Sequence, residues 1–157
     1  MSADPPDLLL EAVSVQRVLT PFLAAGADPI ALTRAFRPSP DDYGKVFRAE
    51  LVAGLRSIYD GIWETQPAIT RKPGQNVLLV HACVAEGFVM GSVMMEAFPG
   101  GYAGLDEDLV PGRVWACWKF VEPGKRLGMA WDGLVHLDGR WVWFPRAWAF
   151  VRKLKTA

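Results

Sequence analysis

Asp132 and His136 are the two residues of this sequence whose types best suit proton transfer. A carboxylate or an imidazole can act as the general base of a small isomerase, dehydratase or hydrolase when its surroundings tune its pKa. The two residues lie four apart in a segment that reads as a β-strand, which separates their side chains by about 13 Å. They therefore cannot form a hydrogen-bonded pair, and each would need a partner from another element.

His81 and Cys83 have the residue types of a base and a nucleophile. Two positions along a strand place them on one face but about 6–7 Å apart, which is too far for direct activation of the thiol. We therefore interpret them as a satisfied core histidine and a buried cysteine. Cys117 lies in a separate apolar run, so we expect two free thiols.

Motifs for metal and phosphate binding are missing from the sequence. Its two histidines and two cysteines show no HExxH, HxH or paired-cysteine spacing, so we expect no metal site and no cofactor. The acidic run 106–108 lacks the alternation of a calcium loop. Phe98–Tyr102 contains two glycines without matching a dinucleotide or phosphate loop, and we interpret it as a tight turn that positions Tyr102.

Three predicted strands carry most of the tryptophans and determine which side chains share a surface. These strands are 113–120, 129–137 and 140–144. Asp138-Gly139 predicts a two-residue type I′ hairpin turn, which needs positive φ at both positions. This turn would place His136 opposite Trp141, and a two-residue turn at Pro123-Gly124 would place Trp118 opposite Met129.

Alternation along these strands predicts two faces. Face one collects Trp118, Phe120, Met129, Trp131, Val135, Val142 and Phe144. Face two collects Trp115, Cys117, Lys119, Asp132, Leu134, His136, Trp141 and Trp143. Face one is almost entirely apolar, so we expect it to pack on the helices.

Face two mixes large aromatic side chains with polar ones, and three interpretations remain open. It has the composition of a small-molecule pocket, of a homodimer or protein-partner surface, or of a sheet covered by the chain's own long loop. The predicted binding residues are Trp115, Lys119, Asp132, His136, Trp141 and Trp143. Adjacent tryptophans are costly to leave in water, so something is expected to cover them.

Helix signals fill the first half of the chain. Asp4 can cap a first helix, with Leu9, Val13, Leu19 and Phe22 on its inner face. Ser39-Pro40-Asp41-Asp42 is a strong helix start. The apolar stripe expected to follow it on one helix is Phe47, Leu51, Leu55, Ile58 and Ile62. Segment 87–96 fits either a strand or a short helix.

Helices followed by consecutive antiparallel strands indicate an α+β fold, in which N-terminal helices pack on a curved, mainly antiparallel C-terminal sheet. The absence of repeats and linkers predicts a single domain over 1–157. In element order, residues 40–150 resemble the cone-shaped NTF2-like and cystatin-like folds, although the Gly-rich loop at 99–112 departs from their pattern. Such folds include both enzymes and binding modules, so the resemblance implies no particular activity.

The overall charge narrows the choice of partners. Seventeen basic residues balance seventeen acidic ones, which argues against nucleic acid. The apolar stretch 8–23 is interrupted by charges and is too short to span a bilayer, and no signal peptide precedes it, so we expect a cytoplasmic protein without a membrane partner. The basic tail residues Arg152, Lys153 and Lys155 are expected to be solvated, with anionic docking as the alternative.

Two functions follow as hypotheses. The first is a non-catalytic domain that binds a partner protein, a second copy of itself, or an apolar small ligand through face two. The alternative is a small enzyme of the isomerase, dehydratase or hydrolase type that uses Asp132 or His136 as general base. A sheet-lined cavity around one of these residues would favour the enzyme.

Overall fold

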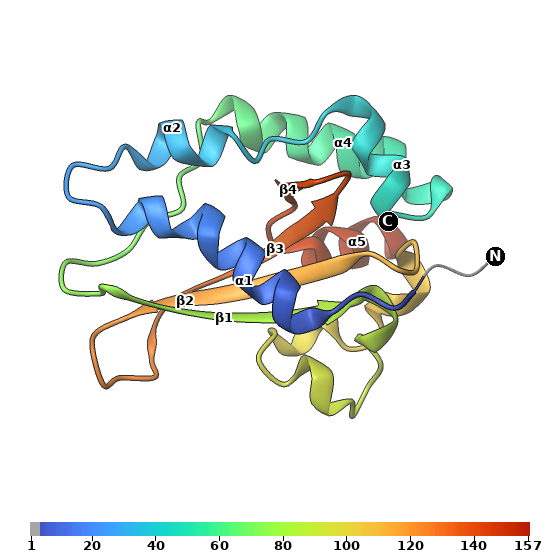
Figure 1. The fold of residues 1–157 in the computed structure, drawn as a ribbon. Coiled ribbons are helices and arrows are strands. Elements are labelled where there is room, and N and C mark those ends of the chain that lie inside the picture. Colours follow the sequence, from blue (N-terminus) through green and yellow to red (C-terminus); the bar gives the residue numbers. More distant parts are fainter. Residues whose placement is uncertain (1–3) are drawn as a thin grey trace.

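The computed structural model describes residues 4–157, and it contains helices on both sides of one four-stranded antiparallel sheet (Figure 1). The strands, in the order β1-β2-β3-β4, are Val77–Val84, Val114–Val121, Gly128–Leu137 and Arg140–Trp143. The α-helices α1 to α5 are Leu8–Leu19, Pro29–Arg34, Tyr43–Val46, Ala49–Glu64 and Ala147–Lys155. The predicted α+β class, with N-terminal helices and a following antiparallel sheet, is confirmed.

Helix α1 begins later than predicted and buries a different stripe. Asp7, not Asp4, caps it, because the Asp7 side chain accepts the backbone N–H groups of the first turn. Val15 and Leu19 point into the core, whereas Leu9 and Val13 are 81% and 51% exposed. The predicted inner face was therefore correct at Leu19 and Phe22, which are 0% and 5% exposed, and wrong at Leu9 and Val13.

The strong helix start at Ser39 is confirmed, but the long helix expected after it is broken. Ser39 and Asp42 form a reciprocal capping box. The chain leaves helical geometry at Phe47, whose backbone is extended and forms an isolated β-bridge with Leu109. Helix α4 then buries a stripe that differs from the predicted one, namely Leu51, Leu55, Tyr59 and Trp63.

The hairpin between β3 and β4 forms as predicted. Asp138 and Gly139 both have positive φ, at 50° and 83°, and His136 pairs with Trp141. Both turn positions thus adopt the left-handed backbone that a type I′ turn requires.

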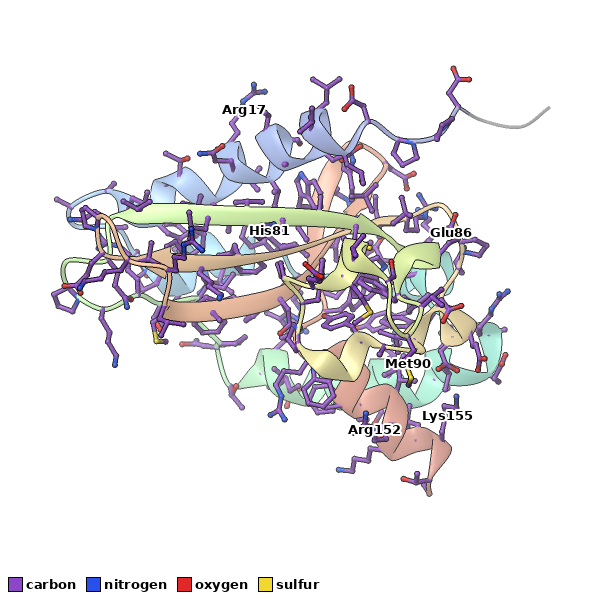
Figure 2. All side chains as sticks on the ribbon, turned by 90° about the horizontal axis from the view of Figure 1, so that it is seen from below. Arg17, His81, Glu86, Met90, Arg152 and Lys155 are labelled. Carbon is purple, nitrogen blue, oxygen red and sulfur yellow. The ribbon has the colours of Figure 1, made fainter. Side chains whose placement is uncertain are left out.

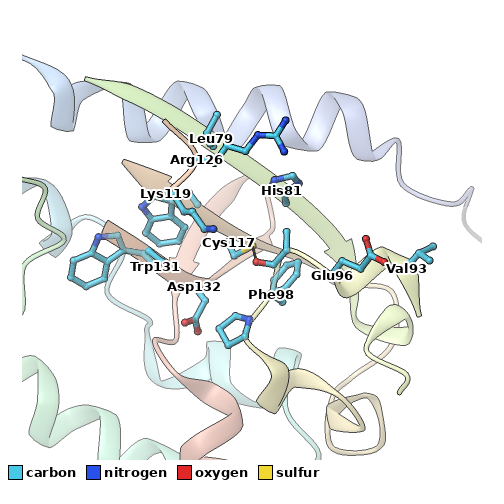
Figure 3. Close-up of a pocket in the computed structure, with 14 residues that line it drawn as sticks. Leu79, His81, Val93, Glu96, Phe98, Cys117, Lys119, Arg126, Trp131 and Asp132 are labelled. Carbon is cyan, nitrogen blue, oxygen red and sulfur yellow. Dashed lines mark hydrogen bonds between the residues drawn. The ribbon is translucent and has the colours of Figure 1, made fainter. Parts of the chain in front are cut away.

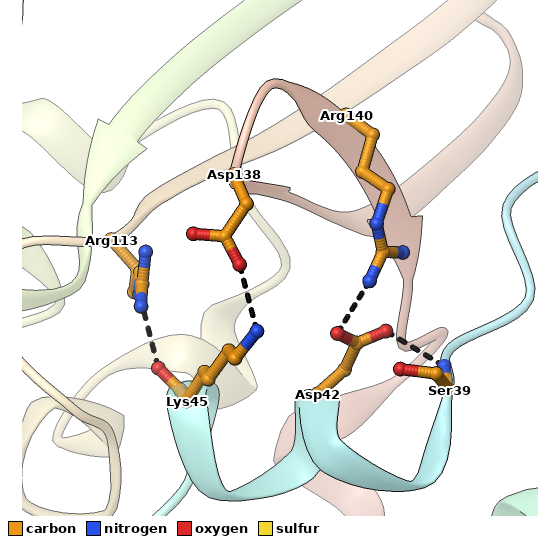
Figure 4. A network of polar contacts seen from close by, with 6 residues as sticks. All are labelled: Ser39, Asp42, Lys45, Arg113, Asp138 and Arg140. Carbon is orange, nitrogen blue, oxygen red and sulfur yellow. Dashed lines mark hydrogen bonds and ion pairs between the residues drawn. The ribbon is translucent and has the colours of Figure 1, made fainter.

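Polar contacts tie this hairpin to the helical layer (Figure 4). Lys45 Nζ lies 2.7 Å from Asp138 Oδ2, and Arg140 forms an ion pair with Asp42, whose second oxygen accepts the Ser39 N–H. The Asp42 side chain is only 1% exposed. A buried carboxylate with two donors is a well-satisfied group, so these contacts fix the hairpin against the start of α3.

The connection from β2 to β3 departs from the prediction. Six residues, 122–127, separate the strands, and Trp118 pairs with Trp131 rather than Met129. The shift of two residues leaves the alternation of β2 unchanged. A β-bulge then interrupts the ladder opposite Ala116 and Cys117, with Gly133 as the extra residue at φ 97°.

The bulge divides predicted face two between opposite sides of the sheet. Alternation is kept on each side of Gly133 but is inverted across it. One side, which we call the helix face, carries Trp118, Phe120, Met129, Trp131, Leu134, His136, Trp141 and Trp143. The other, the pocket face, carries Leu79, His81, Cys83, Trp115, Cys117, Lys119, Ala130, Asp132, Val135 and Val142. The prediction that Asp132 shares a face with His136 was wrong.

Each face is covered by a different part of the chain (Figure 1). Helix α1 packs on the helix face, and α4 reaches it through Trp63, which stacks edge-on against Trp143. The long connection 85–113 covers one end of the pocket face. This connection contains only short 3₁₀ turns, so segment 87–96 is neither the strand nor the helix that we considered.

The basic residues near the C-terminus lie on helix α5, on the side of the molecule shown in Figure 2. Arg152 lies over the Trp148 ring at 5.6 Å, and Lys155 Nζ is 3.1 Å from Asp108 Oδ2. Two of the three basic residues thus have partners within the chain. Among residues 4–157, no helix is both long enough and apolar enough to cross a bilayer.

Candidate ligand-binding pocket

The uncovered end of the pocket face forms the floor of an open cavity of about 820 Å³ (Figure 3). The strand register places two rows of three residues side by side on this floor. One row is Leu79, Lys119 and Ala130, and the next is His81, Cys117 and Asp132. The volume lies within the range of small-molecule sites.

The long connection after β1 provides the far wall of the pocket. Val93, Glu96, Phe98 and neighbouring residues line it, and the β2–β3 loop adds Arg126. Cys117 Sγ donates to Ala97 O at 3.3 Å, which fixes this wall over the floor. Trp118 and Trp131 also border the cavity. The Trp131 ring, however, packs edge-on against Trp143 on the helix face.

Asp132 is the most constrained polar group of the pocket. Its Oδ1 accepts the Tyr102 hydroxyl at 2.6 Å and the Arg146 N–H at 3.1 Å. Its Oδ2 makes no hydrogen bond within residues 4–157, so it is the oxygen available to a ligand. Burial raises the pKa of Asp132 above its ordinary value of 3.8, although the Tyr102 hydrogen bond opposes this shift.

Two cations line the pocket without an acidic partner. Lys119 is half-buried on the floor and Arg126 is exposed at the rim, and neither forms an ion pair within the described part of the chain. Figure 3 shows Leu79, Arg126 and Lys119 at one end of the pocket, whereas Glu96 lies at the opposite rim beside Val93. The pocket thus combines apolar side chains with two acidic groups, Asp132 and Glu96, and two basic ones, Lys119 and Arg126.

His136, Trp141 and Trp143 share one face as predicted, but that face is closed. His136 Nδ1 lies 2.7 Å from Glu11 Oε2 of α1, and its ring stacks on Trp141 at 4.8 Å. The Trp141 indole donates to Ser14 Oγ of the same helix. Trp141 and Trp143 are 4% and 3% exposed. The chain's own helices therefore cover these tryptophans, and no partner surface is left there.

Trp115 lies on the pocket face but does not reach the cavity. It is fully buried among the rings of Phe47, Phe88 and Tyr102, with centroid distances of 6.0–6.1 Å. Of the six predicted binding residues, the structure brings only Lys119 and Asp132 together in the pocket. The other four are structural.

The interpretation of His81 as a core histidine was wrong, because this side chain is exposed and lines the pocket. Sequence reasoning also missed Arg126, Glu96 and the Arg146 N–H. Arg126 and Glu96 lie in loops, where alternation gives no information about direction. The Arg146 N–H reaches Asp132 only because β4 turns into α5 there, with Arg146 at φ 52°. The signal for Tyr102 was present, since the interpretation of Phe98–Tyr102 as a turn that positions this side chain is confirmed.

Comparisons with known proteins give no relative for this arrangement: no family model, curated protein or solved structure matches the chain. Within residues 4–157, no three histidine, cysteine, aspartate or glutamate side chains are grouped so that they could hold a metal ion. The inference about function must therefore rest on the pocket itself.

Proposed function

We propose that the protein is a binding domain for an apolar small molecule, which it holds in the pocket between β1–β3 and the connection 85–113. The observation that carries this proposal is the floor itself, a patch of three strands on which small or aliphatic side chains lie among the polar ones. Leu79, Cys117 and Ala130 leave space there, and Phe98 provides an aromatic wall. Binding sites commonly combine such apolar walls with a few orienting polar groups.

Binding of N-phenyl-1-naphthylamine, an uncharged dye that fluoresces in apolar surroundings, tests this proposal. We expect the wild-type protein to enhance its fluorescence saturably. Ala130→Phe should strongly reduce the enhancement, because Ala130 is an exposed strand position on the floor and an aromatic side chain there projects into the cavity. Saturable binding that persists unchanged in Ala130→Phe would place the dye elsewhere and contradict the proposal.

Lys125→Phe is the matched control. Lys125 is exposed in the β2–β3 loop and does not line the pocket. The substitution therefore adds the same ring outside the cavity. Circular dichroism and thermal unfolding of both variants verify that the fold is retained. Only the Ala130 variant is expected to lose the dye.

A second function, general-base catalysis, is favoured by the surroundings of Asp132. One oxygen is held by Tyr102 and Arg146 while the other is open to the pocket, and burial raises the pKa of the carboxyl. Such a group can take a proton from a bound substrate, as isomerases and dehydratases require. We do not assign this role to His136, because it lies on the helix face, stacked on Trp141 and paired with Glu11.

Carbon-detected NMR of the Asp132 carboxyl tests this second function. We expect the pKa to lie above 3.8 and to rise further in Tyr102→Phe, because the phenol hydrogen bond favours the ionised form. Phenylalanine keeps the buried ring of Tyr102 and removes only its hydroxyl. A wild-type pKa at or below 3.8 would remove the basis for a catalytic Asp132.

A further inference from the structure

We propose that the natural ligand of the pocket is an amphipathic anion, with an apolar body over Leu79 and Phe98 and a carboxylate or similar acidic group between Lys119 and Arg126. This inference rests on the proposed binding function and specifies the charge of the ligand. It follows from the distribution of charged groups around the cavity, which is uneven although the whole chain is neutral.

The acidic groups of the pocket do not pair with its basic groups. Asp132 accepts two hydrogen bonds, and the positive charge of Arg146, from the start of α5, acts on the same carboxyl. Glu96 is exposed and lies at the rim opposite Arg126 (Figure 3). Neither acid lies within ion-pair distance of Lys119 or Arg126 in the described residues.

The basic groups, in contrast, have no ion-pair partner among the described residues and line the pocket from two elements. Lys119 rises from the floor between Leu79 and Ala130, its neighbours on the flanking strands. Arg126 reaches the same end of the pocket from the β2–β3 loop. His81, one row further along the floor, is exposed and can add a third donor.

A half-buried ammonium group beside aliphatic side chains loses part of its hydration without gaining a counterion. An anion placed next to it recovers that loss, and a guanidinium donates to a carboxylate or sulfonate with two parallel N–H groups. The apolar wall then excludes water from the pair, which strengthens the attraction. An uncharged ligand of the same shape would gain only the apolar contact.

Two dyes that share one aromatic body separate these contributions. N-phenyl-1-naphthylamine is neutral, and 1-anilinonaphthalene-8-sulfonate is the same molecule with an acidic group. We expect the wild-type protein to bind the sulfonate about three- to ten-fold more tightly, which is the effect of a few partly exposed charge pairs. The preference should shrink as salt is raised.

Arg126→Gln and Lys119→Met should each weaken binding of the sulfonate dye and leave the affinity for the neutral dye unchanged. Methionine keeps most of the aliphatic stem of Lys119, so the floor stays packed. Lys125→Gln removes a neighbouring positive charge that does not line the pocket, so it should change the affinity for neither dye. Circular dichroism of each variant verifies folding.

The outcomes separate this inference from the function on which it rests. The anionic ligand would be refuted if both dyes bound equally tightly or if the neutral dye bound more tightly. It would also be refuted if Lys125→Gln and Arg126→Gln had equal effects. Each of these outcomes would leave the proposal of an apolar pocket standing. If Ala130→Phe displaces neither dye, the pocket itself is refuted. If it displaces both and only the Lys119 and Arg126 variants lose the sulfonate preference, both proposals are supported.

Discussion

At the scale of single residues, Cys117 shows how a reactive group can be present in a pocket and yet be inert. Its thiol lines the cavity, but it is 4% exposed and donates to Ala97 O. Burial, with a further contribution from the Asp132 charge, raises the pKa of Cys117 to about 12. A thiol attacks as the thiolate, so this position does not supply a nucleophile at neutral pH.

Slow alkylation of both cysteines is therefore expected in the folded protein. Burial also raises the pKa of Cys83, to about 11, with Glu86 as the secondary cause. From the ordinary value of 9.0, a rise to about 12 lowers the thiolate fraction of Cys117 on the order of a thousandfold. Treatment with iodoacetamide at pH 8 and peptide mass spectrometry should find Cys117 unmodified until urea is added, whereas rapid labelling without urea would contradict the buried thiol.

At the scale of elements, the β-bulge at Gly133 determines which residues meet. A Cβ at this position would lie 2.2 Å from Phe144 O, and the backbone has φ 97°. Both observations require glycine, since other residues rarely adopt this conformation and none has room here. The bulge is therefore fixed by its own sequence as well as by its neighbours.

Gly133→Ala should lower the free energy of unfolding by about 3 kcal/mol or more, because backbone strain and a clash with Phe144 O add together. Gly139→Ala is the matched control. It has a similar φ of 83° but nothing within 4 Å of the added Cβ, so we expect a loss of only about 1 kcal/mol. Urea unfolding of both variants measures the difference, and equal losses would show that the close approach to Phe144 has no cost.

The same glycine explains how far the sequence could predict the fold and the site. Alternation and the Asp138-Gly139 turn gave the correct pairing of β3 with β4, and the helix cap at Ser39 was correct. A glycine inside a strand is compatible with a bulge but does not prove one. The sequence pattern alone therefore could not show that the side-chain alternation inverts at Gly133. Lys119 and Asp132 were found for the site, whereas His136, Trp141 and Trp143 were placed on the open face when they lie on the closed one.

At the scale of the whole molecule, the pair of Asp42 and Arg140 joins the helical layer to the sheet (Figure 4). Burial alone would raise the pKa of Asp42, but hydrogen bonds from Arg140 and Ser39 outweigh it and hold the pKa below 3.8. A carboxyl with a lowered pKa stabilises the fold when it is ionised. Its contribution is complete above the unfolded pKa of about 3.9 and is lost as the pH falls through the folded value.

Asp42→Asn should therefore destabilise the protein by roughly 1–2 kcal/mol at pH 7, a value reduced because Arg140 is half-exposed. The difference from the wild type should shrink as the pH falls below about 3.9, because the carboxyl of the unfolded chain is protonated first and that of the folded protein only at lower pH. Thermal unfolding across pH 3–7 measures this convergence. Arg140→Met in combination should add little to Asp42→Asn, and a constant difference at all pH values would exclude ionisation as its source.

The overall arrangement of helices before an open antiparallel sheet agrees with the element order from which the resemblance to cone-shaped NTF2-like and cystatin-like folds was drawn. That resemblance stays a prediction, because no solved structure matches the chain. The molecule differs from the expectation in how its tryptophans are used. Trp115, Trp118, Trp141 and Trp143 are all buried and hold the layers together, which leaves smaller side chains to form the pocket floor.

The extra residue in β3 also shifts the side-chain alternation of this strand by one position across Gly133. Before Gly133, the carboxylate of Asp132 faces the cavity. After Gly133, the imidazole of His136 faces α1. Removing Gly133 would restore a regular side-chain alternation along the strand. With the β3–β4 hairpin in place, Asp132 would then directly precede Leu134, and ordinary alternation would keep Asp132 on the pocket face and Leu134 on the helix face.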